Sequence, residues 1–346
     1  MPEIAVIIPV HNGEETVADA VESVLEQEYD DFELFIMNHN SVDHTRQICE
    51  SYAVRDSRIR IIDVDYGSGA GVPRNLGIQM STAPYITFLD ADDRMESSCL
   101  RNLYNGITRH SADVCIGGFR SFVQGLSSTY EEEYTLPKRC YSTANQVRHF
   151  FAEQYPDMIL GVPWNKLYRR SVIVAHDIAF PEMRRLEDGI FNLRYFDKVQ
   201  SAIVFPEILT VHMESAQVEK GKLNEDFFDE MRYFVIEYYR VMKAWHLNPK
   251  EYEQNMGNYY HNDVVSLLEK RILDDACTDR EIDKIRNDRI SRKMLSLPCL
   301  TGRYTRVAVY LLKARRYGML RGIIRLKRVL KGYVPSVFYV LRKLVN

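Results

Sequence analysis

Three apolar runs in the first 90 residues each end abruptly in polar side chains. Ile4–Val10 is continuous rather than alternating, which predicts a strand buried on both faces of a sheet. Phe32–Met37 and Tyr85–Leu89, each with one polar residue, predict two further strands. Apolar residues at helical spacing follow the first run, over residues 17–25. Strands that alternate with helices in this way predict an α/β fold with a parallel sheet.

The polar residues after these runs are expected to meet at one edge of the sheet, because open α/β sheets bind ligands where their strands end. They are His11-Asn12, residues 38–41 and Asp90-Ala-Asp-Asp93. Asp90 and Asp92 lie on one side of an extended segment, where their charges repel unless a cation lies between them. Hard oxygen ligands favour Mg²⁺ or Mn²⁺, a metal that shares its coordination shell with substrate phosphates. A solvated loop with a helix N-cap is the alternative that the residues alone leave open.

The chain is expected to divide into three parts: residues 1–215, 216–300 and 301–346. The first part holds the strands, and its elements become shorter and mixed after residue 110. Residues 223–295 favour three long helices, broken near Asn248-Pro249 and near Thr278. The last part is predicted to be one further helix, which Pro335 ends.

Charge is distributed very unevenly between these parts. The 45 Lys and Arg and 48 Asp and Glu give a net charge of −3, yet the last 46 residues hold 12 of the basic residues and no acidic one. The first 300 residues therefore carry −15. This asymmetry points to an anionic partner for the tail. Nucleic acid is not expected as that partner, because the body is acidic and has no RNA-binding motif.

A helix over residues 303–331 would place apolar and basic side chains on opposite faces. The apolar face would hold Leu311, Leu312, Met319, Ile323, Leu326 and Leu330, and the basic face Arg306, Lys313, Arg321, Arg325 and Arg328. This pattern is typical of an interfacial helix on anionic lipid. The alternative is a helix packed on the protein's own acidic body.

The remaining features of the sequence indicate a protein inside the cell. The six cysteines show no zinc-ligand spacing and are too few for a disulfide framework, so we interpret them as reduced thiols. The N-terminus lacks the basic region and cleavage site of a signal peptide. No stretch approaches the roughly 18 uncharged apolar residues that span a bilayer. Together with the tail, this predicts a cytoplasmic protein that is peripheral on the inner face of the cell membrane.

Several motifs in order resemble a glycosyltransferase of family 2, with the nucleotide-diphosphosugar fold called GT-A. They are Val6-Ile-Ile-Pro-Val-His-Asn-Gly13, Ser23-Val-Leu-Glu-Gln27, Asp31-Phe-Glu-Leu34, Ser41-Val-Asp43, Gly71-Val-Pro-Arg-Asn-Leu-Gly77 and Tyr85-Ile-Thr-Phe-Leu-Asp-Ala-Asp-Asp93. Val162-Pro-Trp-Asn-Lys-Leu-Tyr-Arg169 and Glu187-Asp188 continue the likeness over roughly the first 215 residues. The resemblance implies a mixed, mainly parallel sheet, followed here by an α-helical C-terminal region.

The resemblance also implies a nucleotide-diphosphosugar donor and a bound Mn²⁺ or Mg²⁺. Pro9 and His11 would border the nucleotide base, Asp90 would face the ribose or the donor sugar, and Arg74 would reach the base or a phosphate. Asp92 would hold the metal that bridges the two donor phosphates, and His212 would reach the same diphosphate. A divalent cation there stabilises the charge that develops on the leaving nucleoside diphosphate.

On the acceptor side, Asp188 aligns with the family's general base, with Glu187 as the other member of the acidic pair. A base is needed because a sugar hydroxyl is a poor nucleophile until its proton is removed. A carboxylate opposite the leaving group implies one in-line displacement with inversion. Trp164 and Lys166 would line the acceptor side. The acceptor would be a hydroxyl of a cell-surface glycan, a teichoic acid or a lipid-linked oligosaccharide.

One departure from the family pattern affects the donor. The family usually has two Asp residues where this chain has Asn38 and His39, and the second commonly accepts a hydrogen bond from the base. His39 can donate or accept, so a UDP-sugar is the default and dTDP-, GDP- and CDP-linked donors stay open. Two other functions remain: a sugar nucleotidyltransferase, and a catalytically silent nucleotide-sugar-binding scaffold. The residues set no expectation for the oligomeric state.

Overall fold

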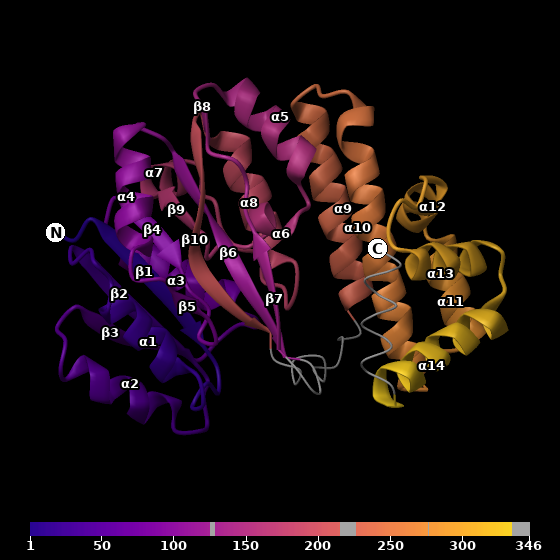
Figure 1. The fold of residues 1–346 in the computed structure, drawn as a ribbon, viewed down its shortest axis with the longest axis horizontal. Helices are drawn as coiled ribbons and strands as arrows, with labels where there is room; N and C mark the ends of the chain where they lie inside the picture. The colour runs from indigo at the N-terminus through magenta and orange to yellow at the C-terminus, as the bar shows by residue number, and fades with distance from the viewer. Residues whose placement is uncertain (125–128, 215–225, 276, 334–346) are drawn as a thin grey trace. The chain divides into compact units, whose positions relative to one another are not determined.

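A computed structural model describes residues 1–124, 129–214, 226–275 and 277–333 (Figure 1). The chain forms two compact units. The first consists of residues 1–151 and 157–220, and the second of residues 152–156 and 221–346. Every candidate site residue named above lies in the first unit.

The first unit is built on one mixed sheet of ten strands in the described part of the chain. Their order is β3-β2-β1-β4-β9-β6-β10-β5, with β7 beside β6 and β8 beside β10. The strands are β1 Ile4–Val10, β2 Phe32–His39, β3 Ile59–Val64, β4 Tyr85–Phe88, β5 Arg94–Met95, β6 Val114–Gln124, β7 Thr129–Tyr134, β8 Arg139–Tyr141, β9 Lys166–Arg169 and β10 Ala202–Glu214. The sheet is therefore the mixed open sheet of the GT-A fold.

Parallel pairing is confined to two places in this sheet. Strands β3, β2, β1 and β4 pair parallel, as do β6 and β10. Strand β9 runs antiparallel between β4 and β6, and β5, β7 and β8 also pair antiparallel with their neighbours. The sheet is less parallel than the sequence suggested, because β9 lies within a motif whose local pattern gave no strand signal.

The helices of the first unit pack on both faces of the sheet. They are α1 Val17–Leu25, α2 Thr45–Ala53, α3 Gly71–Met80, α4 Cys99–Arg109, α5 Ala144–Gln154, α6 Met158–Gly161, α7 Arg170–Ala175 and α8 Glu187–Lys198. Ile4, Val6 and Ile8 of β1 belong to the apolar core that includes residues of α1 and α4. Ile7 points to the other face, where a Cβ built on Gly77 of α3 would lie 2.7 Å from it. Only glycine at this position lets α3 approach β1 so closely.

The second unit is helical in the part of it that the structure describes. Its helices are α9 Phe227–Ala244, α10 Pro249–Leu273, α11 Asp279–Asn287, α12 Arg289–Ser296, α13 Arg303–Lys313 and α14 Tyr317–Tyr333. The side chains of Asn248 and Thr278 cap α10 and α11, so both predicted breaks are confirmed. Asp288 caps a further helix, α12, where the sequence predicted one uninterrupted helix to residue 295.

The single helix predicted for the tail is wrong. Arg315 adopts a positive φ of 57° and separates α13 from α14. The predicted apolar face divides accordingly: Leu311 and Leu312 are buried, whereas Met319 and Leu326 are 61% and 56% exposed. Residues 334–346, with Pro335, lie outside the described residues.

Basic side chains of α14 bind acidic side chains within the same unit. Arg321 pairs with Asp279 at 2.5 Å, and Lys327 pairs with Glu269 at 2.7 Å. Arg325 approaches Asp275 at 3.1 Å, with both side chains exposed. Part of the positive charge of the tail is thus paired with acidic side chains of the same unit. No helix among the described residues combines the length and apolarity that crossing a bilayer requires.

Candidate active site

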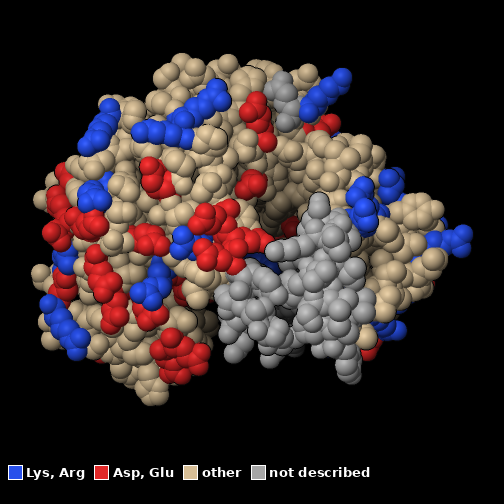
Figure 2. Space-filling view, in the orientation of Figure 1, with Lys and Arg blue, Asp and Glu red and all other residues tan. Residues whose placement is uncertain are grey.

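A pocket of about 1080 Å³ opens where β1 and β4 end in the first unit. Residues 9–13 and 90–92 form one part of its wall, and the start of α8 forms another. The predicted site residues that line it are Pro9, His11, Arg74, Asp90, Asp92, Glu187 and Asp188. Acidic side chains predominate on the face of this unit shown in Figure 2. The structure thus brings together residues that lie as much as 179 positions apart in the sequence.

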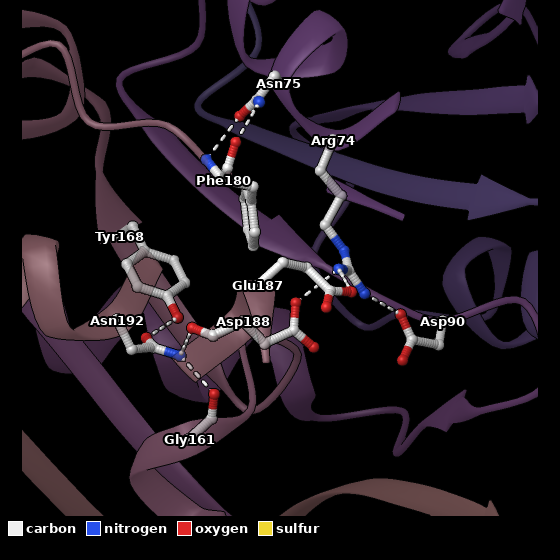
Figure 3. A network of polar contacts seen from close by, with 9 residues as sticks. All are labelled: Arg74, Asn75, Asp90, Gly161, Tyr168, Phe180, Glu187, Asp188 and Asn192. Atoms are coloured by element: carbon white, nitrogen blue, oxygen red, sulfur yellow. Dashed lines mark hydrogen bonds and ion pairs between the residues drawn. The ribbon is translucent and has the colours of Figure 1, made fainter. Parts of the chain in front are cut away.

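A buried arginine connects the two acidic motifs at this pocket (Figure 3). Arg74, on α3, is 1% exposed and donates from Nη1 to Asp188 Oδ1 and from Nη2 to Asp90 Oδ1, both over 2.6 Å. Glu187 Oε1 lies 3.8 Å from Arg74 Nη1. One guanidinium therefore faces three carboxylates. Such a fork suits two separate carboxylates better than a lysine would.

The electrostatics of this cluster favour a proton-accepting role for Asp188. Desolvation by the pocket walls raises the pKa of Asp188 well above its usual range; Arg74 opposes this shift, while the charges of Glu187 and Asp90 add to it. Burial lowers the pKa of Arg74, but the three carboxylates raise it by more than burial lowers it. The pKa therefore lies above the usual arginine value, and the guanidinium stays charged. A carboxylate whose pKa is moved toward neutrality is a stronger general base than an ordinary aspartate.

The three acids after β4 have different surroundings. Asp92 is exposed to the pocket, and its pKa is raised by the surrounding walls and by the charge of Asp90. Asp93 is fully buried, and its Oδ1 accepts from His212 Nδ1 at 2.9 Å and from Met213 N at 3.0 Å. Sequence reasoning missed Asp93. Its position directly after Asp92 was the only signal, and that position does not reveal its partner on β10.

Residues 5–175 match the family model for glycosyl transferase family 2. This part of the chain belongs to that family. It is 29% identical over 196 residues to EpsH of Bacillus subtilis (strain 168), covering 56% of this chain and 55% of EpsH. It is 25% identical over 250 residues to poly(ribitol-phosphate) beta-N-acetylglucosaminyltransferase TarS of Staphylococcus aureus (strain Mu50), covering 68% of this chain and 40% of TarS. The chain thus spans only about half the length of these curated relatives.

Solved structures show the same fold. The structure of residues 1–349 of S. aureus TarS in complex with UDP-GlcNAc superimposes with a TM-score of 0.63. It covers 95% of this chain and 92% of that one at 19% sequence identity. The likeness therefore establishes the GT-A fold.

The family's metal has suitable donors at this pocket. No group of three His, Cys, Asp or Glu side chains in the described ranges is arranged to hold a metal ion. Mg²⁺ and related ions, however, are often bound through one or two carboxylates together with substrate phosphates. Asp92 and Asp90 supply two hard oxygen donors on the pocket wall, and a cation near them would relieve their mutual repulsion. The donor set fits the metal that the family pattern implies.

The predicted acceptor residues do not lie on the pocket wall. Trp164 is 2% exposed and packs against Phe119 and against the ring of His212, whose centroid is 5.4 Å away at an interplanar angle of 18°. Lys166 is fully buried, and its Nζ donates to Ile159 O, Val162 O and Asn165 Oδ1. Burial lowers the pKa of Lys166 well below its usual range. Both side chains are thus used within the core, and the acceptor contact predicted for Trp164 and Lys166 stays a prediction.

Asn38 and His39 also lie beside the pocket rather than on its wall. Asn38 Nδ2 donates to Asp63 Oδ1 over 2.7 Å. His39 Nε2 lies 3.2 Å from Tyr66 O, and its own carbonyl accepts from His11 Nδ1 at 2.6 Å. His11 lines the pocket. The predicted contact of Asn38 and His39 with the nucleotide stays a prediction.

Proposed function

We propose that this chain is an inverting glycosyltransferase that moves a sugar from a nucleotide-diphosphosugar to an acceptor hydroxyl. The observation that carries the proposal is Asp188, a partly buried carboxylate with a raised pKa, in one pocket with the acidic motif after β4. Asp188 takes the proton of the acceptor hydroxyl while the oxygen of that hydroxyl attacks the anomeric carbon of the donor sugar. The new carbon–oxygen bond forms as the bond to the donor phosphate breaks, and the nucleoside diphosphate leaves.

A divalent cation, Mn²⁺ or Mg²⁺, belongs to this proposal. Asp92 would hold it with Asp90 close by, and His212, whose ring is hydrogen-bonded to the buried Asp93, would reach the same diphosphate. When bound, the ion stabilises the negative charge that develops on the departing diphosphate. The chain's own residues hold the donor and orient the base.

The donor and acceptor classes are supported by the relatives alone. TarS is named a poly(ribitol-phosphate) beta-N-acetylglucosaminyltransferase, and its solved structure contains UDP-GlcNAc. We therefore place UDP-sugars first, with a hexose or N-acetylhexosamine as the sugar. A hydroxyl-rich cell-surface polymer such as a teichoic acid is the first acceptor class to test.

A transfer assay tests this function directly. The purified chain is incubated with Mn²⁺, a radiolabelled UDP-sugar panel and poly(ribitol phosphate), and labelled polymer is measured. Transfer that Asp188→Asn abolishes supports the proposal. A sugar nucleotidyltransferase would instead release pyrophosphate from a nucleoside triphosphate and a sugar phosphate. A silent scaffold would bind the nucleotide-sugar and transfer nothing to any acceptor of the panel.

We also propose that the tail associates with an anionic membrane surface on the cytoplasmic side. Support comes from apolar side chains of α13 and α14 that stay exposed in the described structure: Val307, Tyr310, Met319, Leu326 and Val329. Exposed Arg303, Arg306, Arg325 and Arg328 lie on the same two helices. Mixed basic and apolar exposure is typical of interfacial helices. The ion pairs to Asp279 and Glu269 reduce the charge available for lipid.

A further inference from the structure

Asn75 fastens α3 to the segment that leads into α8. Its Nδ2 donates to Phe180 O over 2.8 Å, and Phe180 N donates to Asn75 Oδ1 over 2.9 Å (Figure 3). The Phe180 ring then stacks on Phe191 of α8, with centroids 3.9 Å apart. A Cβ on Gly71, at the start of α3, would lie 2.9 Å from Phe180 Cβ. The close approach of α3 to this segment is therefore built into the backbone.

Arg74, the residue before Asn75 on α3, is enclosed by the same segment. Its guanidinium carbon lies 5.3 Å from the Phe180 ring centroid, and the side chain is 2% exposed. Its Nη1 and Nη2 are hydrogen-bonded to Asp188 and Asp90, and the buried Nε has no hydrogen-bond partner among the described residues. A guanidinium enclosed in this way has little surface left for a nucleotide base or phosphate.

We propose that Arg74 is a positioning residue that holds the base Asp188 against the donor-binding Asp90, with Asn75 keeping the arginine in place. This inference rests on the proposed function. Oδ1 of Asp188 is bound to Arg74, whereas Oδ2 makes no hydrogen bond within the described ranges and is left for the acceptor hydroxyl. Because one rigid fork holds both carboxylates, it fixes the distance between the proton acceptor and the donor sugar.

The charges around Asp188 make this role measurable. Arg74 from α3 and Lys166 from β9 lower its pKa, whereas Glu187 beside it on α8 and Asp90 after β4 raise it. Tyr168 of β9 also faces this site, and its hydroxyl donates to Asn192. Removal of the Arg74 charge should therefore raise the pKa of Asp188. The acidic limb of the kcat–pH profile would then move to higher pH.

The experiment compares Arg74→Gln and Arg74→Lys with the control Arg58→Gln, whose side chain binds Asp56 away from the pocket. Each variant is assayed for kcat against pH and for UDP affinity in the presence of Mn²⁺. We expect Arg74→Gln to lower kcat by about 100-fold and to move the acidic limb upward, with the UDP Kd changed less than about twofold. Arg74→Lys should lose kcat with a smaller shift of the limb, because it keeps the charge and loses the fork.

Weaker UDP binding with an unmoved acidic limb would assign Arg74 to the nucleotide and overturn the proposal. Because Arg74→Gln leaves buried carboxylates unmatched and could unfold the unit, Asn75→Ala is the second variant, with Asn102→Ala on α4 as its control. Asn75→Ala should lower kcat at constant UDP affinity; full kcat in this variant also contradicts the proposal. If the wild-type chain transfers no sugar, a ¹³C-carboxyl NMR titration of Asp188 still decides, because its pKa must rise in Arg74→Gln.

Discussion

Arg74 Nη1 donates to Asp188 Oδ1 over 2.6 Å, although the two residues are 114 positions apart in the sequence. The same guanidinium binds Asp90, so the carboxylate that follows β4 and the carboxylate that begins α8 share one cation. Three carboxylates around one arginine leave an excess of negative charge in a partly desolvated site. Desolvation is the main cause that raises the pKa of Asp188, and the neighbouring negative charges of Glu187 and Asp90 add to it.

Replacement of Asp188 by Asn tests the base. The amide keeps the shape of the side chain but accepts no proton, so kcat should fall by roughly 10²–10⁴-fold while UDP binding persists. Turnover and calorimetric titration with UDP and Mn²⁺ measure the two effects. A larger loss of kcat in Glu187→Gln would mean that Glu187 is the base.

The wild-type rate should increase as the pH rises through the raised pKa of Asp188, because only the ionised carboxylate accepts the proton. The acidic limb of kcat should therefore lie above the ordinary aspartate range. Rate measurements at saturating donor and acceptor across the pH range give this limb. A limb near the usual aspartate pKa would show that Asp188 is not the titrating group.

The stability of Asp188→Asn relative to wild type should also depend on pH, because the pKa of Asp188 is raised in the folded state. A carboxyl group whose pKa is higher in the folded than in the unfolded state stabilises the protein less as the pH rises from the ordinary aspartate range through the folded pKa. The amide introduced by Asp188→Asn does not ionise, so this variant does not lose this stability as the pH rises. The variant should therefore unfold at a higher temperature than wild type at pH 8. The difference should shrink toward pH 4. Thermal unfolding curves at both pH values check this; an equal difference at both would contradict the raised pKa.

The metal prediction concerns Asp92. Asp92→Ala should abolish the extra thermal stability that UDP and Mn²⁺ together give the wild-type chain, because ligand binding stabilises the folded state by mass action. Asp30→Ala serves as the control, since Asp30 is 92% exposed and lies outside the pocket. Unchanged Mn²⁺-dependent stabilisation in Asp92→Ala would remove Asp92 from the metal site.

The tail prediction uses surface substitutions rather than truncation. Leu311, Leu312, Leu320 and Ile324 are buried, so a chain that ends at residue 300 would expose apolar core and should be destabilised. The double variant Met319→Glu, Leu326→Glu should co-sediment much less with anionic vesicles than the wild-type chain, which salt should release. Val54→Glu, also on an exposed apolar residue, is the control. Equal binding of all three proteins would contradict a lipid-facing α14.

Strands with both faces buried were predictable because their apolar runs are local signals. Ile4–Val10 was predicted with the bounds that the structure gives, and the strand predicted over Phe32–Met37 begins where β2 begins. Helix breaks at Asn248 and Thr278 were equally local, since each depends on a side chain that caps its own helix. The break at Arg315 was missed, because a positive φ at arginine has no sequence signal.

The sequence by itself determined the strands of the N-terminal sheet, the motifs of the family and the acids that reach the pocket, because each depends on neighbouring residues. Tertiary structure alone decided what surrounds those acids. It buried Lys166 among carbonyl oxygens, placed His212 beside Asp93, and brought Arg74 into a hydrogen bond with Asp188. Burial and charge pairing depend on residues from different elements that meet only in the fold, and these two effects set the pKa of the base.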